Sequence, residues 1–257
     1  MINKKIKNNN GKIMFEWAKD LFPICRSLTG EGNRKTLRYI KNILPNLKIK
    51  YVKSGYKAFD WVVPLEWNIK DAYIKDLKGK KIVNFKDNNL HVMGYSIPIH
   101  KKVNLNDLQN HLFSIKSMPN AIPYKTSYYK SDWGFCIEHK KRKTLKNDFY
   151  EIKIDSNLKK GQLDYADLII KGKSKKEILI STYICHPSMA NNELSGIIVT
   201  TMIAKWLSEK KLFYTYRFVF VPETLGAIVY IKKNLEVLKK RTIAGYVLSC
   251  VGDNNNY

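Results

Sequence analysis

The second half of the sequence alternates between segments typical of buried strands and segments typical of amphipathic helices. Short apolar runs rich in β-branched and aromatic residues predict strands, and longer runs with apolar residues at helical spacing predict helices. By these criteria the strands are 149–156, 164–172, 177–184, 214–222 and 244–252, and the helices are 194–211 and 225–241. Strands and helices that take turns in this way predict an α/β fold, an αβα sandwich around a largely parallel or mixed sheet.

Polar residues mark the carboxyl ends of three of these predicted strands. The polar segments are CHPSMANNE at 185–193, PET at 222–224 and CVGDNNN at 250–256. In open α/β sheets, ligands bind beside the carboxyl ends of the strands. We therefore expect the three segments to meet and to form the functional site.

The first polar segment has two interpretations. His186 stands at a strand end, and Glu193 follows at the mouth of a predicted helix. Imidazole and carboxylate are ordinary zinc ligands, so the two residues are a candidate metal site. A lone histidine after a strand is more often structural, however, and Asn191 and Asn192 are suited to cap a helix that begins near Leu194. Capping and metal binding are compatible, and the pattern alone leaves both open.

Three further side chains near strand ends have a structural and a functional interpretation. Glu223 is placed either to stabilise a helix N-terminus or to act as a general base toward water activated by a metal, and the pattern favours neither. Asp253 lies four residues from the last residue, where fraying is the ordinary expectation. Cys185 adjoins His186, and because a strand alternates its faces, we expect their side chains to point in opposite directions. A buried core thiol is the favoured interpretation of Cys185.

The first part of the chain predicts two helices, a strand and then a change of character. The helices are 12–28 and 33–44, with Asn33 as N-cap of the second, and the strand is 48–54. From about residue 59 to 138, short strand-like pieces are broken by Pro, Gly and Asn, with one helical stretch at 104–115. This pattern predicts a small β-rich module inserted into a larger fold. Its aromatic residues are either core or a stacking surface for a sugar or peptide.

The charge of the chain does not point to a specific nucleic-acid partner. The net charge is +24, but the excess is mostly lysine scattered along the chain, and arginine, which reads bases and phosphates by paired contacts, is scarce. No apolar run approaches the roughly 20 residues of a membrane helix, and no signal-peptide core follows the start. The four cysteines are widely spaced, as in reduced proteins. We expect a cytoplasmic protein without a membrane partner.

Several long stretches resemble a bacterial family of aminopeptidase-like proteins, often found near surface-polysaccharide biosynthesis genes. The family lies in the zinc exopeptidase superfamily of leucyl aminopeptidases. The stretches that carry the resemblance are FPICRSLTGEGNRKTL, FDWVVPLEWNIKDAYIKD, NLHVMGYSIPIHKK, AIPYKTSYYKSDWGFC, ICHPSMANNELSG, VPETLGAI and GYVLSCVGD. The resemblance implies an aminopeptidase-like domain in two parts, 1–58 and 148–257, with the β-rich module inserted at 59–147. It also implies that the family continues beyond the last residue here, so we expect an incomplete second part.

The resemblance also implies a zinc site. His186 corresponds to the first histidine ligand, and Glu223 corresponds to the general base. Asn192 stands where the superfamily has a metal-bridging aspartate, and a neutral amide bridges metals poorly. Carboxylates are also replaced where the superfamily orients the histidine or adds further ligands, at positions 188, 224 and 249 or 250. We therefore expect one zinc ion rather than two.

These observations predict an aminopeptidase-like zinc metallohydrolase. His186 and Glu193 would hold the metal, with Asn192 as a weaker candidate, and Glu223 would take the proton from the attacking water. The substrate would be a peptide or another acylated amine, and a homo-oligomer is one arrangement the sequence allows. Because a catalytic zinc normally has three protein ligands, an inactive chain is also an expected outcome. The alternative is a non-catalytic binding or assembly protein on the same scaffold; an RNA-binding protein ranks third.

Overall fold

The computed structural model describes residues 4–254 and divides the chain into two compact units. The sandwich unit comprises residues 1–63 and 161–257, and the inserted unit comprises residues 64–160. The first boundary lies after residue 63 rather than 58, because residues 57–62 form a hairpin that contacts the sandwich unit. The second lies after residue 160 rather than 147, because the strand at 149–159 pairs within the inserted unit. Among the described residues, no helix has both the length and the apolar character needed to cross a bilayer.

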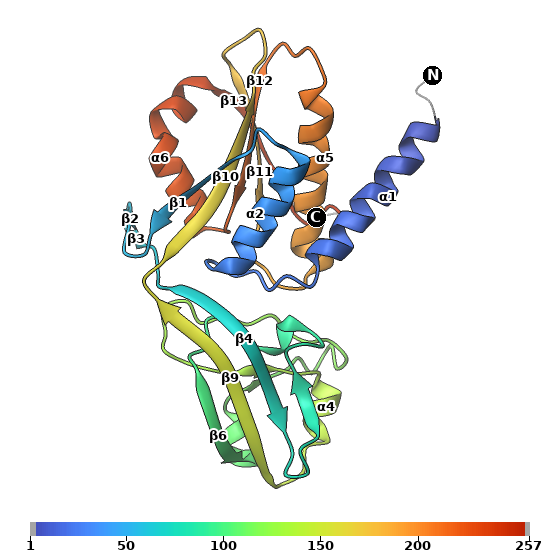
Figure 1. Ribbon diagram of the computed structural model, residues 1–257, viewed down its shortest axis with the longest axis vertical. Coiled ribbons are helices and arrows are strands. Elements are labelled where there is room, and N and C mark those ends of the chain that lie inside the picture. The colour runs from blue at the N-terminus through green and yellow to red at the C-terminus, as the bar shows by residue number, and fades with distance from the viewer. Residues whose placement is uncertain (1–3, 255–257) are drawn as a thin grey trace. The chain divides into compact units, whose positions relative to one another are not determined.

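The sandwich unit is built on a mixed five-stranded sheet (Figure 1). Strand β11 lies parallel to its neighbours β12 and β13, whereas β10 runs antiparallel to β12 and to β1. In spatial order the strands are β1 (Lys48–Lys53), β10 (Gln162–Ile170), β12 (Thr215–Val221), β11 (Glu177–Tyr183) and β13 (Thr242–Val247). The predicted α/β sandwich with a mixed sheet is confirmed.

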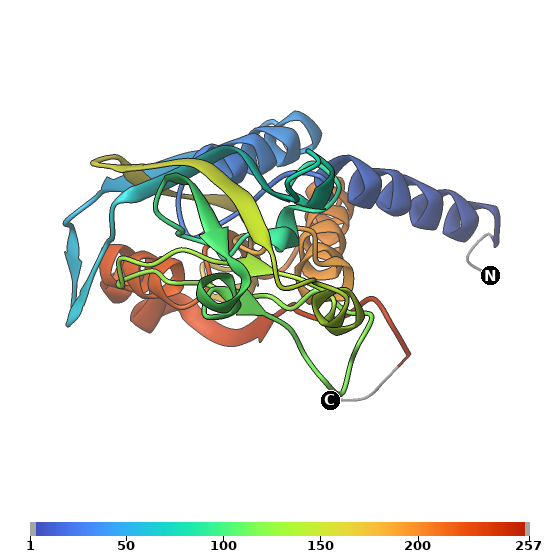
Figure 2. The same cartoon turned by 90° about the horizontal axis from the view of Figure 1, so that it is seen from below.

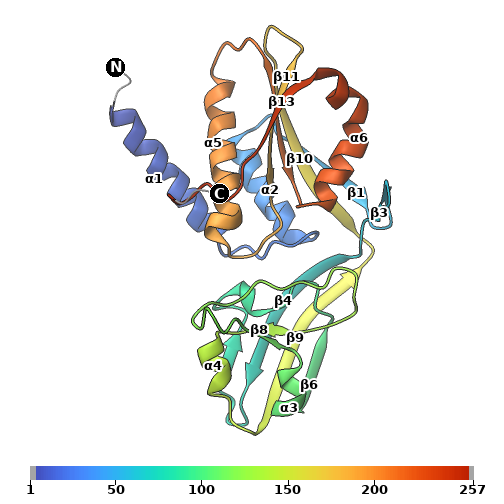
Figure 3. The ribbon, with the colours of Figure 1, turned by 180° about the vertical axis from the view of Figure 1, so that it is seen from behind.

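Helices cover both faces of this sheet (Figure 3). On one face, α2 packs onto β10 and α5 packs onto β11 and β12, and Leu37, Ala204 and Phe218 belong to the core they share. On the other face, α6 packs onto β10, where the Tyr230 ring meets the edge of the Tyr165 ring. The helices of this unit are α1 (Lys4–Leu21), α2 (Glu31–Ile43), α5 (Gly196–Ser208) and α6 (Leu225–Arg241).

The first two helices differ from the prediction at their ends. Helix α1 ends at Leu21 rather than near residue 28, because Pro23 disfavours the helical conformation of the residue before it. Helix α2 begins at Glu31 after Gly30, whose φ of 102° suits glycine. Asn33 therefore lies inside the helix, and its side-chain oxygen accepts the main-chain N–H of Ser27 instead of capping.

A short hairpin completes the sandwich unit. Strands β2 (Lys57–Ala58) and β3 (Trp61–Val62) follow β1 and extend away from it, as the light-blue hairpin in Figure 2 shows. Lys232 of α6 donates to the Lys57 carbonyl at 2.9 Å.

The inserted unit is built on a four-stranded antiparallel sheet. Its strands, in spatial order, are β5 (Lys81–Asn84), β4 (Glu66–Lys75), β9 (Phe149–Lys159) and β6 (Ile99–Asn104). The helix expected at 104–115 is shorter, because the chain leaves it for strand β7. The remaining elements are η1 (Asn89–His91), α3 (Leu105–Gln109), β7 (Leu112–Phe113), β8 (Phe135–Cys136) and α4 (His139–Lys143).

The large aromatic side chains of the inserted unit pack mostly inward. Trp67 stacks on Tyr95 with ring centroids 5.9 Å apart, and both side chains are buried. Trp133 is also buried and stacks on His111 at 3.7 Å. These rings are core rather than a stacking surface, although Tyr129 is exposed.

Candidate metal site at the carboxyl end of the sheet

The loop after β11 carries the predicted site residues. The strand ends at Tyr183, and the chain passes through a π-helical turn, η2 (Ala190–Ser195), into α5. Asn192 has non-helical backbone angles, which kink this turn. Gly196 begins α5 close to the segment after β13, since an added Cβ would lie 2.3 Å from the Leu248 carbonyl oxygen. The loop is therefore folded tightly against the end of the sheet.

Glu193 is buried beneath this loop with hydrogen-bond partners on both of its oxygens. Its Oε1 atom accepts the Nε–H of Arg26 at 2.8 Å, and neither side chain is exposed to solvent. Its Oε2 atom accepts the main-chain N–H groups of Cys185 and His186, the latter at 2.7 Å. A buried carboxylate requires partners of this kind.

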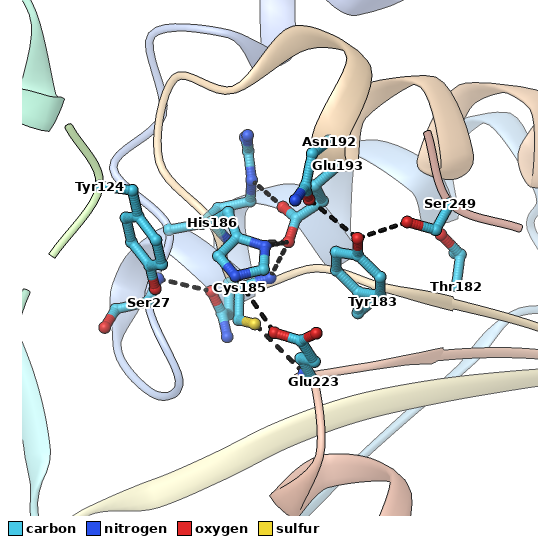
Figure 4. Close-up of polar contacts among 12 residues, drawn as sticks. Ser27, Tyr124, Thr182, Tyr183, Cys185, His186, Asn192, Glu193, Glu223 and Ser249 are labelled. Carbon is cyan, nitrogen blue, oxygen red and sulfur yellow. Dashed lines mark hydrogen bonds and ion pairs between the residues drawn. The ribbon is translucent and has the colours of Figure 1, made fainter. Parts of the chain in front are cut away.

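The His186 imidazole lies between two carboxylates (Figure 4). Its Nδ1 atom is 3.2 Å from Glu193 Oε2, and its Nε2 atom is 3.3 Å from Glu223 Oε2. The His186 side chain is 6% exposed, whereas that of Glu223 is 51% exposed. One carboxylate thus lies inside the protein behind the ring, and the other faces solvent in front of it.

Glu223 joins the end of β12 to the same loop. Its main-chain N–H donates to the Sγ atom of Cys185 at 3.1 Å. The next residue, Thr224, has a φ of 54°, and α6 begins directly after it. The structure thus brings together the polar ends of β11 and β12, as the sequence predicted.

The segment after β13 reaches a neighbouring part of the loop. Asn191 donates from Nδ2 to Asp253 at 2.6 Å and accepts the Gly252 N–H at 2.8 Å. Asn192 accepts the Tyr183 hydroxyl at 2.8 Å. Neither amide caps α5, whose N-cap is Ser195, because both make contacts elsewhere.

Cys185 lies on the same side as His186, contrary to the prediction of opposite faces. Potential ligand atoms of Cys185, His186 and Glu193 all lie within 4.8 Å of one another. The alternation does not apply because β11 ends at Tyr183, before Cys185. Burial raises the pKa of the Cys185 thiol, and the negative charge of Glu193 raises it further. The expected buried thiol is found, but it lies at the site.

The sequence did not indicate a role for Arg26. It is buried, and its Nη1 donates to the Leu21 carbonyl at the end of α1 at 2.7 Å. The available signal was a scarce arginine inside the apolar stretch FPICRSL.

The geometry can be compared with the needs of a zinc ion. Two ligand atoms of a tetrahedral zinc lie about 3.4 Å apart, given Zn–N and Zn–O bonds of about 2.1 Å. The 3.3 Å between His186 Nε2 and Glu223 Oε2 matches this separation. Both oxygens of Glu193 already accept hydrogen bonds. The residues present therefore offer a zinc ion two ligand atoms in front of His186, its own Nε2 and an oxygen of Glu223, one fewer than the three protein ligands of an ordinary catalytic zinc.

Comparison with known proteins gives matches along nearly the whole chain. The family model described as "Domain of unknown function (DUF4910)" matches residues 15–257. A Clostridium acetobutylicum protein described as "Putative polysaccharide biosynthesis protein with aminopeptidase-like domain" is 50% identical over 254 residues, which are 98% of this chain and 58% of that protein. The chain thus spans little more than half the length of this relative.

Solved structures share the fold. A crystal structure of a "putative peptidase" from Clostridium acetobutylicum has a TM-score of 0.94 at 49% identity, covering 99% of this chain and 60% of the other. BSAP, a zinc aminopeptidase from Bacillus subtilis, has a TM-score of 0.62 at 12% identity, covering 95% and 69%. The second likeness concerns the fold alone.

Proposed function

The chain belongs to the DUF4910 family, and from this premise we propose that it is an aminopeptidase-like metallohydrolase acting on amide bonds. The observation that carries the proposal is the position of His186. Its ring lies at the carboxyl ends of β11 and β12, between buried Glu193 and exposed Glu223. His186 Nε2 and the Glu223 carboxylate are separated by the distance between two zinc ligands. A zinc ion bound there would lower the pKa of a bound water and so make it nucleophilic.

His186 and Glu223 would have different tasks in this reaction. His186 would hold zinc through Nε2, and a bound zinc ion would supply the Lewis acidity that makes water nucleophilic near neutral pH. Glu223 would accept the proton of the attacking water and deliver it to the leaving amine. Its half-exposed side chain suits this task, because it can reach both solvent and a substrate.

We propose a peptide or another acylated amine as the substrate. The description of the Clostridium acetobutylicum relative mentions polysaccharide biosynthesis, which supports including acylated amino sugars in this class. A cytoplasmic location, a homo-oligomeric assembly and the lack of a specific nucleic-acid or membrane partner complete the proposal.

Zinc analysis of three variants tests the proposed function. We expect about one zinc per wild-type chain after equilibration with buffered zinc, and little in His186→Ala, since its Nε2 is the anchoring ligand. His100→Ala is the control, because this exposed histidine lies in the inserted unit. We expect Glu223→Gln to bind zinc more weakly than wild type, because it loses a ligand oxygen, and to lose about 10²–10⁴-fold in hydrolysis of aminoacyl and acetyl amides.

A non-catalytic binding protein is the second candidate. Asn192 offers an amide where a carboxylate would bridge metals, and that amide already accepts the Tyr183 hydroxyl. Wild-type protein that takes up no zinc and hydrolyses none of these amides would contradict the metallohydrolase and favour this candidate. If Glu223→Gln loses zinc together with activity, Glu223 is a ligand rather than only a base.

A further inference from the structure

We propose that a cavity at the amino end of the sandwich sheet binds a phosphorylated small molecule of the size of a nucleoside diphosphate. The cavity has a volume of about 890 Å³, and only residues of the sandwich unit line it. It lies at Glu177 and Thr215, the first residues of β11 and β12, whereas His186 follows the far end of β11. At about 3.3 Å per residue, the seven residues of β11 span about 20 Å. The cavity is therefore separate from the proposed metal site.

The lining of the cavity has an excess of positive charge. Two carboxylates line it, those of Asp167 and Glu177. Cationic side chains outnumber them and belong to Lys48, Lys50, Lys171, Lys173, Lys175 and Arg241. A ligand that neutralises this excess is an anion, and lysine ammonium groups bind phosphate as point charges.

Both carboxylates are buried and already paired with cations. Asp167 lies 2.7 Å from Lys50 Nζ. Glu177 accepts two hydrogen bonds from Arg217, which is itself buried, and lies 3.4 Å from Arg241. Three cations thus surround two carboxylates, so the lysines that remain in the lining are not needed to neutralise them.

Four exposed lysines remain in the lining. They are Lys48, Lys171, Lys173 and Lys175. Within residues 4–254, their ammonium groups make no hydrogen bond or ion pair. Like charges gathered around one hollow repel one another in a protein of net charge +24, and a bound anion would relieve this repulsion.

The loop that carries three of these lysines has a fixed backbone. The N–H groups of Lys173 and Ser174 donate to the carbonyls of residues 212 and 213 at 3.0 and 2.7 Å. The Gly172 N–H donates to Thr215 Oγ1 at 3.2 Å. Positions 171, 173 and 175 are exposed and alternate with less exposed residues. A ligand would therefore meet lysines on a preorganised loop and would not need to order the backbone, which lowers the cost of binding.

The volume and the apolar part of the lining indicate the size of the ligand. Small-molecule sites usually measure about 300–1,000 Å³, so this cavity is much larger than a single phosphate ion requires. Leu168, Ile169 and Ile170 line it beside the charged groups. An apolar wall next to several ammonium groups suits a molecule with a phosphate chain and a less polar remainder. A nucleoside diphosphate combines these two features.

Two sets of lysines of equal charge separate a specific site from the general attraction of a basic protein for anions. The cavity triple combines Lys171→Gln, Lys173→Gln and Lys175→Gln. The control triple, at positions outside the lining, combines Lys12→Gln, Lys35→Gln and Lys53→Gln. All six side chains are exposed, so we expect both variants to fold like wild type.

Calorimetric titration of the full chain with adenosine diphosphate, at about 0.15 M salt, tests the proposal. We expect the cavity triple to bind about tenfold more weakly than wild type, the effect of losing three exposed ion pairs. The control triple should bind within about twofold of wild type, because its lysines do not line the cavity. Pyrophosphate should bind no more tightly than adenosine diphosphate, since it leaves the apolar wall uncovered.

Protection from acetylation locates the bound ligand. We expect saturating adenosine diphosphate to slow the reaction of acetic anhydride with Lys171, Lys173 and Lys175, measured by mass spectrometry of peptides. The reaction at Lys35 and Lys53 should keep its rate.

The outcomes separate the site from its alternatives. Equal weakening in the two triples would assign the binding to general charge and would overturn the proposal. Wild type that binds no adenosine diphosphate, or that binds pyrophosphate more tightly, would also overturn it. So would acetylation slowed equally at all the lysines measured. A loss confined to the cavity triple, with protection confined to its three positions, would support the proposed site whether or not the chain binds zinc.

Discussion

The sandwich unit contains two buried arginine–glutamate pairs, one toward each end of strand β11. Glu177, the first residue of β11, receives two hydrogen bonds from Arg217, at 2.6 and 3.0 Å. Beyond the other end of the strand, Glu193 receives one hydrogen bond from Arg26, at 2.8 Å. The four side chains are at most 4% exposed. The two pairs therefore share their burial and differ in what surrounds them.

The pair at the amino end belongs to a larger network of charged and hydroxyl groups. Arg217 also donates to the Tyr230 hydroxyl, which donates to Asp167, and Lys50 lies 2.7 Å from the same carboxylate. These contacts tie β1, β10, β11, β12 and α6 together and involve no residue of the candidate site. We assign this network to the stability of the fold.

The pair at the carboxyl end is open toward the candidate site. Glu193 Oε2 accepts the main-chain N–H groups of Cys185 and His186 and lies 3.2 Å from His186 Nδ1. Among the described residues, Arg26 Nη2 is buried without a hydrogen-bond partner. Incomplete satisfaction of this kind is expected where positioning of a functional group competes with stability. Burial of an ion pair therefore does not reveal its role, whereas the groups next to it do.

The largest expected loss in the free energy of unfolding comes from removing the arginine of either pair while its glutamate stays buried. Arg26→Ala leaves Glu193 as an uncompensated buried charge, and we expect a loss of about 3–5 kcal/mol in the free energy of unfolding. Arg217→Ala should lie near the lower end of this range, because Arg241 remains 3.4 Å from Glu177. Urea unfolding followed by circular dichroism at the helix band measures both, since the long helices lie in the sandwich unit. A cost below about 1 kcal/mol for Arg26→Ala would contradict its burial as an ion pair.

Two tyrosine hydroxyls, one near each end of β11, allow the hydrogen bonding at the two ends to be compared by a smaller loss of stability. Tyr230→Phe removes a hydroxyl that bonds both Arg217 and Asp167 at 3.0 Å, and hydrogen bonds to charged groups contribute about 1.5–3 kcal/mol. Tyr183→Phe removes a hydroxyl that bonds the neutral Asn192 and Ser249 side chains, for which about 0.5–1.5 kcal/mol is expected. The same urea measurement compares them. An equal or larger cost for Tyr183→Phe would show that the amino-end network is not the stronger one.

The parts of this unit that the sequence predicted depend on local patterns. Helix α6 occupies residues 225–241 as expected, and strands β11 and β12 lie within one residue of their expected bounds. Hydrophobic periodicity and flanking breakers are read within a window of a few turns, so they locate such elements. The same local reading placed His186 and Glu223 at adjacent strand ends, and the structure brings them within 3.3 Å.

The parts that the sequence did not predict depend on distant contacts. Arg26 and Glu193 are 167 residues apart, and no local pattern pairs them. Strand β9 was placed with the larger domain, yet it pairs with β4 and β6, because sheet partners are chosen across the chain. The predicted orientation of Cys185 was wrong for a third reason: β11 ends at Tyr183, before both Cys185 and His186, so strand alternation does not apply to them.

The smallest expected effect is the loss of stability at alkaline pH, which differs between the groups near the two ends of β11. Burial raises the pKa of the Cys25 thiol, next to Arg26, to about 12, although the charge of Arg26 lowers it. A native pKa above the unfolded value of about 8.5 contributes stability that is full below that value and is lost as pH rises toward 12. Because Cys25 is partly exposed as a residue, we expect a loss of about 1 kcal/mol between pH 8 and 10 rather than the full effect. At the amino end, burial and Asp167 raise the pKa of Tyr230, whose unfolded value is about 10, so the stability that it contributes is lost at higher pH.

Urea unfolding at pH 8, 9 and 10 should therefore show a free energy of unfolding that falls less steeply with pH for Cys25→Ala than for wild type, and as steeply as wild type for Tyr230→Phe. Parallel curves for wild type and Cys25→Ala would assign the alkaline loss to other groups.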